Sequence, residues 1–155
     1  MSVLVNKGLN VEIINVISNI STKLKTRTFL VGGYVRDLLL GRKSKDIDVL
    51  VIGDGISFAS EVKKKLGSKA NMQIFKNFGT AMIAYNDLEI EFVGSRKESY
   101  QKNSRNPVVS IGTFEDDISR RDFTINSIAI SLNEDNKGEI IDLFDGIQDL
   151  KKGII

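Results

Sequence analysis

The sequence predicts a single domain of the α/β (α+β) class. Segments with the three- and four-residue spacing of amphipathic helices are interspersed with short, β-branched runs that are typical of strands. The length of 155 residues corresponds to about one domain, at the usual ~100–200 residues per domain. A hydrophobic share of 41% and a charged share of 27% are close to the average of soluble globular proteins and allow a buried core.

Helices are predicted where apolar side chains recur at a helical period. Gly41 and Gly67 follow two of these segments and are expected to end them, since glycine readily adopts the left-handed conformation at a helix C-terminus. A further helix should begin at Thr113, because the acidic residues 115–117 would face the positive end of its dipole. The other expected helices cover residues 11–25, 35–40 and 56–66.

Strands are predicted in short β-favouring runs between turn residues, and Asn86-Asp87 should join two of them in a tight hairpin. Residues 94–111 differ, because they are polar, contain Pro107 and show no sustained period. We interpret them as a long, partly mobile loop of a kind that is often functional. The expected strands are 28–31, 46–52, 72–75, 80–85, 88–93, 127–132 and 139–143.

The chain contains neither cysteine nor histidine. These absences exclude a thiol nucleophile, a disulfide framework, a Cys/His zinc site and every triad that uses histidine. Catalysis would therefore depend on carboxylates, Lys, Arg, hydroxyl or backbone groups. A bound metal should be a hard ion such as Mg²⁺ or Mn²⁺, because carboxylates are the strongest ligands left.

The net charge of +2 is a weak basic bias, despite a pI near 8.8. A dedicated nucleic-acid-binding domain usually has a clearer basic excess. Lys63-Lys64-Lys65 is the longest basic run, and we interpret it as the solvated face of a helix. No run of 18 apolar residues and no secretory signal occur, so we expect no membrane contact. The absence of cysteine fits a reducing cytoplasm, and we expect the protein to be cytoplasmic.

Gly32-Gly33 lies between an expected strand and an expected helix. Paired glycines let the backbone approach a ligand, and the free N–H groups of a helix start attract phosphate. Arg36 lies one turn later and could add charged donors. Taken alone, the pair is more often an ordinary strand-to-helix turn.

Two pairs of acids alternate with apolar residues in expected strands. Asp46 and Asp48 share one face of their strand, and Glu89 and Glu91 share one face of theirs. Two carboxylates so close repel each other unless a cation lies between them. If the two strands are neighbours, a glutamate could complete a three-carboxylate cluster that holds two Mg²⁺ ions. A solvated acidic face is the alternative, and it is a strong competitor for Glu89.

The segment from Arg120 to Asn126 reads RRDFTIN and combines phosphate-binding side chains with polar ones. On a helix, Asp122 and Asn126 would lie one turn apart and could present to one ligand together. Arg120 and Arg121 would point in different directions. A helix cap with a surface ion pair explains the segment about equally well.

The order of these features resembles the class II tRNA nucleotidyltransferase and bacterial poly(A) polymerase family. The resemblance runs from about Phe29 to the C-terminus and rests on an ordered set of motifs, which is more specific than a lone Gly-Gly or Asp-x-Asp. The motifs are LVGGYVRD (30–37), KDID (45–48), IEFV (90–93), RKESY (96–100), EDD (115–117), RRDFTIN (120–126) and DLFDGIQDL (142–150).

The resemblance implies a polymerase-β-like nucleotidyltransferase fold, with a mixed, mostly antiparallel sheet of about five strands flanked by helices. It implies Mg²⁺-dependent transfer of CMP or AMP from CTP or ATP to an RNA 3′-hydroxyl with release of pyrophosphate, most naturally as CCA addition to tRNA. Residue by residue, it assigns catalysis to Asp46, Asp48 and Glu91, with metal on Asp46 and Asp48, and nucleotide binding to Gly32, Gly33, Arg36, Arg120, Arg121, Asp122 and Asn126.

Residues 1–155 are therefore expected to be a catalytic head domain. In the family a base-selecting Glu/Asp-Asp-x-x-Arg motif follows the head in a helical neck, and no such motif stands at that place in these residues. We expect the neck and the RNA-gripping body and tail to lie outside this chain, so the isolated chain could be inactive. A poly(A) polymerase, a partial A- or C-adding enzyme and a non-catalytic nucleotide-binding regulatory module remain as alternatives.

Overall fold

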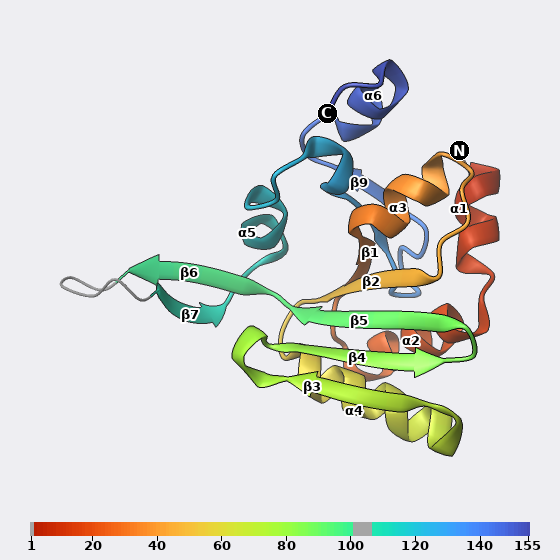
Figure 1. Ribbon diagram of the computed structural model, residues 1–155, viewed down its shortest axis with the longest axis vertical. Helices are drawn as coiled ribbons and strands as arrows, with labels where there is room; N and C mark the ends of the chain where they lie inside the picture. The colour runs from red at the N-terminus through yellow and green to blue at the C-terminus, as the bar shows by residue number, and fades with distance from the viewer. Residues whose placement is uncertain (1, 101–106) are drawn as a thin grey trace.

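The computed structural model describes residues 2–100 and 107–155, in which a seven-stranded sheet runs through the molecule (Figure 1). The seven expected strand segments are confirmed with end differences of at most one residue, whereas the resemblance implied about five strands. The sheet comprises β1 (Thr28–Val31), β2 (Asp46–Val51), β3 (Asn71–Phe75), β4 (Thr80–Tyr85), β5 (Leu88–Gly94), β8 (Ile128–Ser131) and β9 (Ile140–Asp142).

The expected helices are confirmed, and the structure adds a helix at each end of the chain and three short 3-10 turns. No helix in the described ranges is long and apolar enough to cross a membrane. The helices are α1 (Ser2–Leu9), α2 (Glu12–Leu24), α3 (Gly32–Leu39), α4 (Gly55–Leu66), α5 (Phe114–Ser119) and α6 (Gly146–Lys152), with the 3-10 turns η1 (Gly67–Lys69), η2 (Lys76–Phe78) and η3 (Thr124–Asn126).

The strands are ordered β3-β4-β5-β2-β1-β8-β9, and β2 and β5 form the parallel pair of an otherwise antiparallel sheet. In that pair Asp46 lies opposite Glu89, and Asp48 lies opposite Glu91. Because opposite residues in a pleated pair point to the same side, all the acids of these strands share one face of the sheet.

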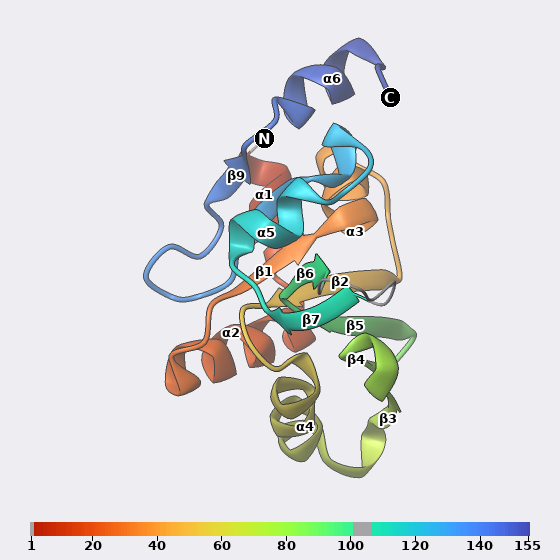
Figure 2. The same cartoon turned by 90° about the vertical axis from the view of Figure 1, so that its left-hand side faces the viewer.

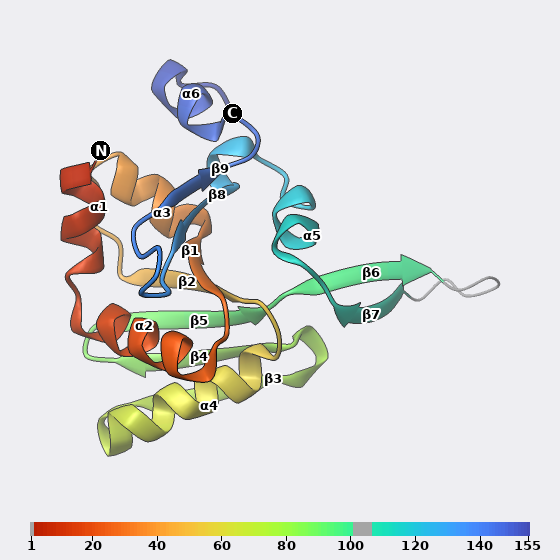
Figure 3. The same ribbon diagram turned by 180° about the vertical axis from the view of Figure 1, so that it is seen from behind.

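Helices α2 and α4 cover the face of the sheet that is turned to the viewer in Figure 3, and Figure 2 shows them on one side of it. Ile14 and Ile17 of α2 and Phe58 of α4 join buried residues of β2 and β5, such as Val49 and Phe92, in the main core. On the opposite face, α5 closes a smaller cluster. Within residues 2–100 and 107–155, no helix lies over β5, β4 and β3 in the view of Figure 1, so the described part of the chain leaves the acidic face open.

The prediction of one long loop over Gly94–Ile111 is wrong. Residues Arg96–Tyr100 form β6 and Pro107–Ile111 form β7, an antiparallel pair that makes its own two-stranded sheet. The hairpin projects away from the main sheet in Figure 1, so it does not need the alternating pattern that identifies a half-buried strand. Pro107 is the first residue of β7, a position at which proline is tolerated. Residues 101–106 lie outside the described residues.

Candidate active site

The acidic face of β2 and β5 brings the predicted catalytic residues together. Asp48 and Glu91 are register partners on the neighbouring strands, both partly buried, and Asp46 lies two residues away on the same face. Asp46 and Glu89 are more exposed, at the beginning of the two strands. The structure thus confirms that the two acidic strands are neighbours, on which the three-carboxylate prediction depends.

Asp48 is the most perturbed carboxyl of this row. Burial, together with the negative charges of Glu91 and Asp46, raises the pKa of Asp48 to about 6 against the opposing charge of the Arg121 guanidinium. A carboxylate that is held between burial and like charges is destabilised in its ionised form. It therefore favours a bound cation at neutral pH.

The donors at this face are the hard oxygen ligands that Mg²⁺ and Mn²⁺ prefer. Within the described ranges, no three carboxylates lie close enough together to bind a metal ion by themselves. Mg²⁺ is usually held by one or two carboxylates together with substrate phosphates, not by a complete protein cage. Asp46 and Asp48 fit that mode of binding, with Glu91 beside them.

Gly32 lies against these carboxylates at the start of α3. Its φ of +69° is a left-handed conformation, and a Cβ atom added there would lie 3.0 Å from Asp48 Oδ2 and 3.6 Å from Arg121 Nη1. The turn at Gly32 also starts the helix three residues before the expected Val35. Free N–H groups of this helix start therefore lie next to Asp48, where a phosphate could meet both.

Replacement of Gly32 by alanine is expected to weaken nucleotide binding at least tenfold. The left-handed backbone disfavours any Cβ by about 1 kcal/mol, and the new methyl group would press on the Asp48 carboxylate. Binding of ATP measured by calorimetry would show the loss. Gly67→Ala is the matched control, because Gly67 has φ +73° but nothing within 4 Å of its Cβ position. Equal ATP affinity in the Gly32 and Gly67 variants would contradict the assignment.

Arg36 and Asn126 are brought together although they lie 90 residues apart, because Arg36 Nη1 donates to Asn126 Oδ1 at 3.1 Å. Arg36 Nε also donates to Asp37 Oδ1 at 3.0 Å. The guanidinium packs over Gly33, whose added Cβ would lie 3.3 Å from Arg36 Nη2. The arginine is thus oriented from both sides at the glycine turn.

The remaining predicted residues line one open cleft of about 420 Å³. Its wall consists of Arg120, Arg121, Asp122 and Asn126 together with Val93 and Phe123. The prediction that Asp122 and Asn126 share a helix is wrong, because α5 ends at Ser119 and a separate 3-10 turn covers Thr124–Asn126. Asp122 and Asn126 both line the cleft because the chain between α5 and the 3-10 turn folds around it. The one-turn spacing of a continuous helix does not explain their proximity.

Asp117 also belongs to this site, although its place among the acids 115–117 predicted only the start of a helix and part of a motif. Its carboxylate is fully buried and accepts hydrogen bonds from Arg120 Nη2 at 3.0 Å and from Arg121 Nη2 at 3.1 Å and Nε at 3.3 Å. One buried anion therefore orients both arginines of the cleft. The Asp-to-Arg spacings of three and four residues at the end of a helix were the signal in the sequence.

The last helix supports this arrangement from behind. Gly146 packs so closely on the 3-10 turn that an added Cβ would lie 2.2 Å from the Thr124 carbonyl oxygen. Thr124 Oγ1 donates to Asp149 Oδ2 at 2.6 Å. At the start of α6, the amide of Gly146 donates to Asp142 Oδ1 at 2.8 Å, and the amide of Ile147 donates to Asp142 Oδ2 at 2.9 Å. The motif at residues 142–150 thus holds in place the turn that carries Asn126.

Comparison with known proteins agrees with this geometry. Residues 28–155 match the family model of the poly A polymerase head domain. The A-adding tRNA nucleotidyltransferase of Aquifex aeolicus (strain VF5) is 41% identical over 129 residues, which are 83% of this chain and 15% of that protein.

Two solved structures have the same fold. A CCA-adding enzyme in an apo form has a TM-score of 0.82 and 34% identity, over 98% of this chain and 36% of its own. A tRNA nucleotidyltransferase complexed with a primer tRNA and an incoming ATP analogue has a TM-score of 0.75 and 37% identity, over 87% of this chain and 36% of its own. The chain spans about a third or less of the length of the relatives it matches. From its motifs, its fold and these matches, the chain belongs to the poly A polymerase head domain family.

Proposed function

We propose that residues 1–155 are the catalytic head of a tRNA nucleotidyltransferase that transfers CMP or AMP from CTP or ATP to an RNA 3′-hydroxyl. The observation that carries the proposal is the register of Asp48 with Glu91 beside Gly32 and Arg121. It puts acidic groups for a metal and donors for a phosphate at one place. CCA addition to tRNA is the favoured reaction, because relatives that are 34–41% identical to this chain are named CCA-adding and A-adding enzymes.

The reaction forms a bond between the RNA 3′-oxygen and the α-phosphorus, breaks the bond from the α-phosphorus to the bridging oxygen, and releases pyrophosphate. Asp46 and Asp48 would hold two Mg²⁺ ions, for which Mn²⁺ is a substitute. Bound there, the metal ions supply charge neutralisation for the phosphates and for the attacking oxygen. Glu91 lies next to Asp48, where its carboxylate would help to take the proton of the 3′-hydroxyl.

The other predicted residues would hold the nucleotide. Gly32 and Gly33 would offer backbone N–H groups to the triphosphate, and Arg36 would add a charged fork beside them. The cleft residues Arg120, Arg121, Asp122 and Asn126 would contact the ribose and the phosphates. Asp117 is a positioning residue in this scheme, because it acts through the two arginines.

Removal of divalent metal is expected to stop the reaction completely. The intact protein is incubated with CTP, ATP, Mg²⁺ and a tRNA that lacks its 3′-terminal CCA, and the 3′ ends are sequenced. Chelation should abolish addition, and excess Mg²⁺ or Mn²⁺ should restore it. Addition that persists in the chelator would contradict the proposed metal role of Asp46 and Asp48.

The same assay, repeated with a tRNA that ends in CC and with an unrelated RNA, separates the other candidates from the first. A partial A-adding enzyme is favoured by the name of the Aquifex relative, and it would extend only a tRNA that already ends in CC. A poly(A) polymerase would add adenylates to unrelated RNAs. A non-catalytic regulatory module would bind ATP without extending any RNA, and the presence of Asp46, Asp48 and Glu91 makes it the weakest candidate.

A further inference from the structure

A groove of about 460 Å³ lies outside the candidate active site, between α1, α3 and the connection from α3 to β2. Figures 1 and 3 show these three segments at the same end of the molecule. Leu4, Leu38 and the largely buried Tyr34 contribute its apolar part. The Tyr34 hydroxyl donates to the Gly8 carbonyl oxygen at 3.3 Å, which ties α3 to α1 along the groove.

Basic side chains surround this apolar floor. Lys7, Arg42, Lys43 and Lys45 line the groove together with Ser44, and no acidic residue lines it. All four basic side chains belong to exposed residues, and none takes part in an ion pair with the described residues. The groove therefore carries uncompensated positive charge.

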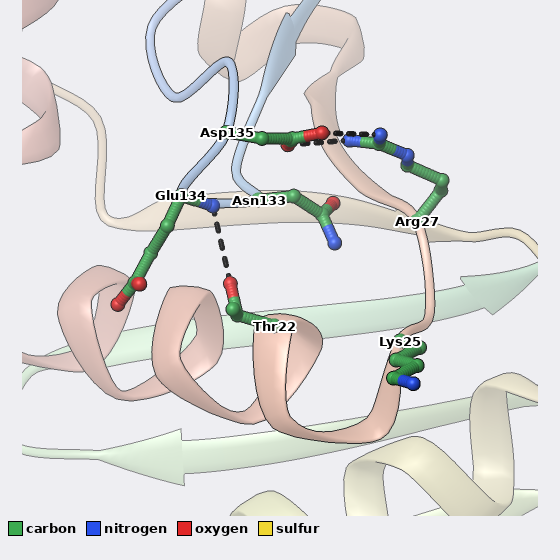
Figure 4. A pocket seen from close by; sticks show the side chains of 6 residues that line it. All are labelled: Thr22, Lys25, Arg27, Asn133, Glu134 and Asp135. Carbon is green, nitrogen blue, oxygen red and sulfur yellow. Dashed lines mark hydrogen bonds and ion pairs between the residues drawn. The ribbon is translucent and has the colours of Figure 1, made fainter.

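A second hollow shows the opposite arrangement. It lies between the end of α2 and residues 133–135, and there Arg27 donates to both carboxylate oxygens of Asp135, at 2.8 and 2.6 Å (Figure 4). Its two basic residues, Lys25 and Arg27, are matched by two acids, Glu134 and Asp135. The groove differs from this hollow because only basic side chains line it, with no acid among them.

We propose that this groove, with Lys7, Arg42, Lys43 and Lys45 on its rim, binds the phosphate backbone of the RNA substrate. The inference rests on the proposed function, since an RNA chain must reach the carboxylates of β2. Lys45 immediately precedes Asp46, and its carbonyl oxygen accepts from the Glu89 amide at 2.9 Å, so the rim is continuous with the acidic row. Positive charge at this end of the acidic row would offset the repulsion between the acids and a polyanion.

An RNA strand fits the two parts of the groove. Phosphates on the backbone match the basic rim, and a base or ribose can pack on the apolar floor, as in other grooves that follow a nucleic acid strand. Each lysine or arginine that contacts a phosphate releases a counterion, so its loss changes the salt dependence of binding. That dependence is a direct measure of phosphate contact.

The test compares Arg42→Ala/Lys43→Ala with the unchanged intact protein in binding to a labelled tRNA over a range of salt concentrations. Binding is expected to weaken roughly tenfold at 0.1 M salt, and the slope of log K against log salt should become shallower by about 1.5. Lys64→Ala/Lys65→Ala is the matched control, because it removes two charges from α4, which covers the opposite face of the sheet. The control should keep both the affinity and the slope.

The outcomes separate this inference from the proposed function. Equal affinity and slope in the groove variant and the α4 variant would overturn the inference, even if the unchanged protein extends tRNA. Failure of tRNA extension together with the expected loss of RNA binding would overturn the proposed reaction and keep the groove. Both variants must unfold at a midpoint near that of the unchanged protein, so that a change in RNA binding does not reflect unfolding. If the double groove variant does not fold, the single variant Lys43→Glu is tested in its place.

Discussion

Asp48→Asn is expected to abolish nucleotide transfer and, at the same time, to make the metal-free protein more stable. Asparagine keeps the shape of the side chain but removes the charge that would hold a metal ion against the phosphates. Charge stabilisation by bound metal contributes several kcal/mol to such a transition state, so the rate should fall about 10²- to 10⁴-fold. The gain in stability has a separate origin, in the raised pKa of Asp48 to about 6.

The sign of the stability change follows from that pKa. The folded protein binds a proton at Asp48 more tightly than the unfolded chain, whose pKa is the usual 3.8. Ionisation of Asp48 therefore destabilises the folded state increasingly as the pH rises from about 4 to about 6. Above about pH 6 the destabilisation has reached its full size. A shift of this size is worth at most about 3 kcal/mol, and the partial exposure of the side chain reduces the effect to about 1–2 kcal/mol.

Urea unfolding in a chelator, at pH 4.5 and pH 7.5, would measure both parts of this prediction. Asp48→Asn should unfold at higher urea than the unchanged protein at pH 7.5, and the difference should shrink at pH 4.5. Glu89→Gln is the matched control, because it removes a charge from the same face two residues from Glu91, at an exposed position. A destabilised Asp48→Asn protein at pH 7.5 would refute the electrostatic picture of the site.

Asp117→Asn is expected to raise the KM for ATP about 10- to 100-fold. The buried carboxylate orients Arg120 and Arg121, and charge-assisted bonds from correctly placed guanidinium groups to phosphate are worth about 1.5–3 kcal/mol. Loss of one partner of a buried charge pair should also lower the free energy of unfolding by about 3 kcal/mol. Steady-state kinetics below the unfolding midpoint would give KM and kcat separately.

A neighbouring residue distinguishes positioning from stability. Asp116 accepts from the Thr113 amide at 2.9 Å in the capping box of the same helix, so Asp116→Asn should cost about 1 kcal/mol of stability with the KM unchanged. Asp117→Glu keeps the anion and should recover part of the affinity. If Asp116→Asn and Asp117→Asn raised the KM equally, Asp117 would have no orienting role beyond holding the helix.

Local patterns in the sequence were sufficient for most of the elements. In Asp46–Val51 and Glu12–Leu24, the apolar residues that recur at the strand or helix period are the residues that the core buries. The sequence pattern therefore indicates these two elements correctly. Helix α1 was not predicted, because Asn6 and Lys7 interrupt a segment whose Val5 and Leu9 are nevertheless buried. Tertiary packing, and not intrinsic propensity, accounts for that helix.

The family resemblance named the site residues as one set, whereas local patterns alone indicated them only as separate pairs. The spacing of Asp46 and Asp48 showed that they share a face, but no local rule could show that β5 lies beside β2, because strands distant along the chain pair through the whole fold. The importance of Asp117 depends on its complete burial, which a run of three acids at a helix start does not predict. The bond from Arg36 to Asn126 likewise joins segments 90 residues apart.

The parallel pairing of β2 with β5 has a consequence for the order of folding. Parallel neighbours cannot be joined by a tight turn, so the chain between β2 and β5 runs through α4, β3 and β4 before Asp48 lies beside Glu91. Closing so long a connection is slow compared with forming the β4–β5 hairpin, and a slip of one residue would turn one acid to the other face. We therefore expect the acidic row to be assembled late in folding, so that its correct assembly would report that the central sheet has reached its native register.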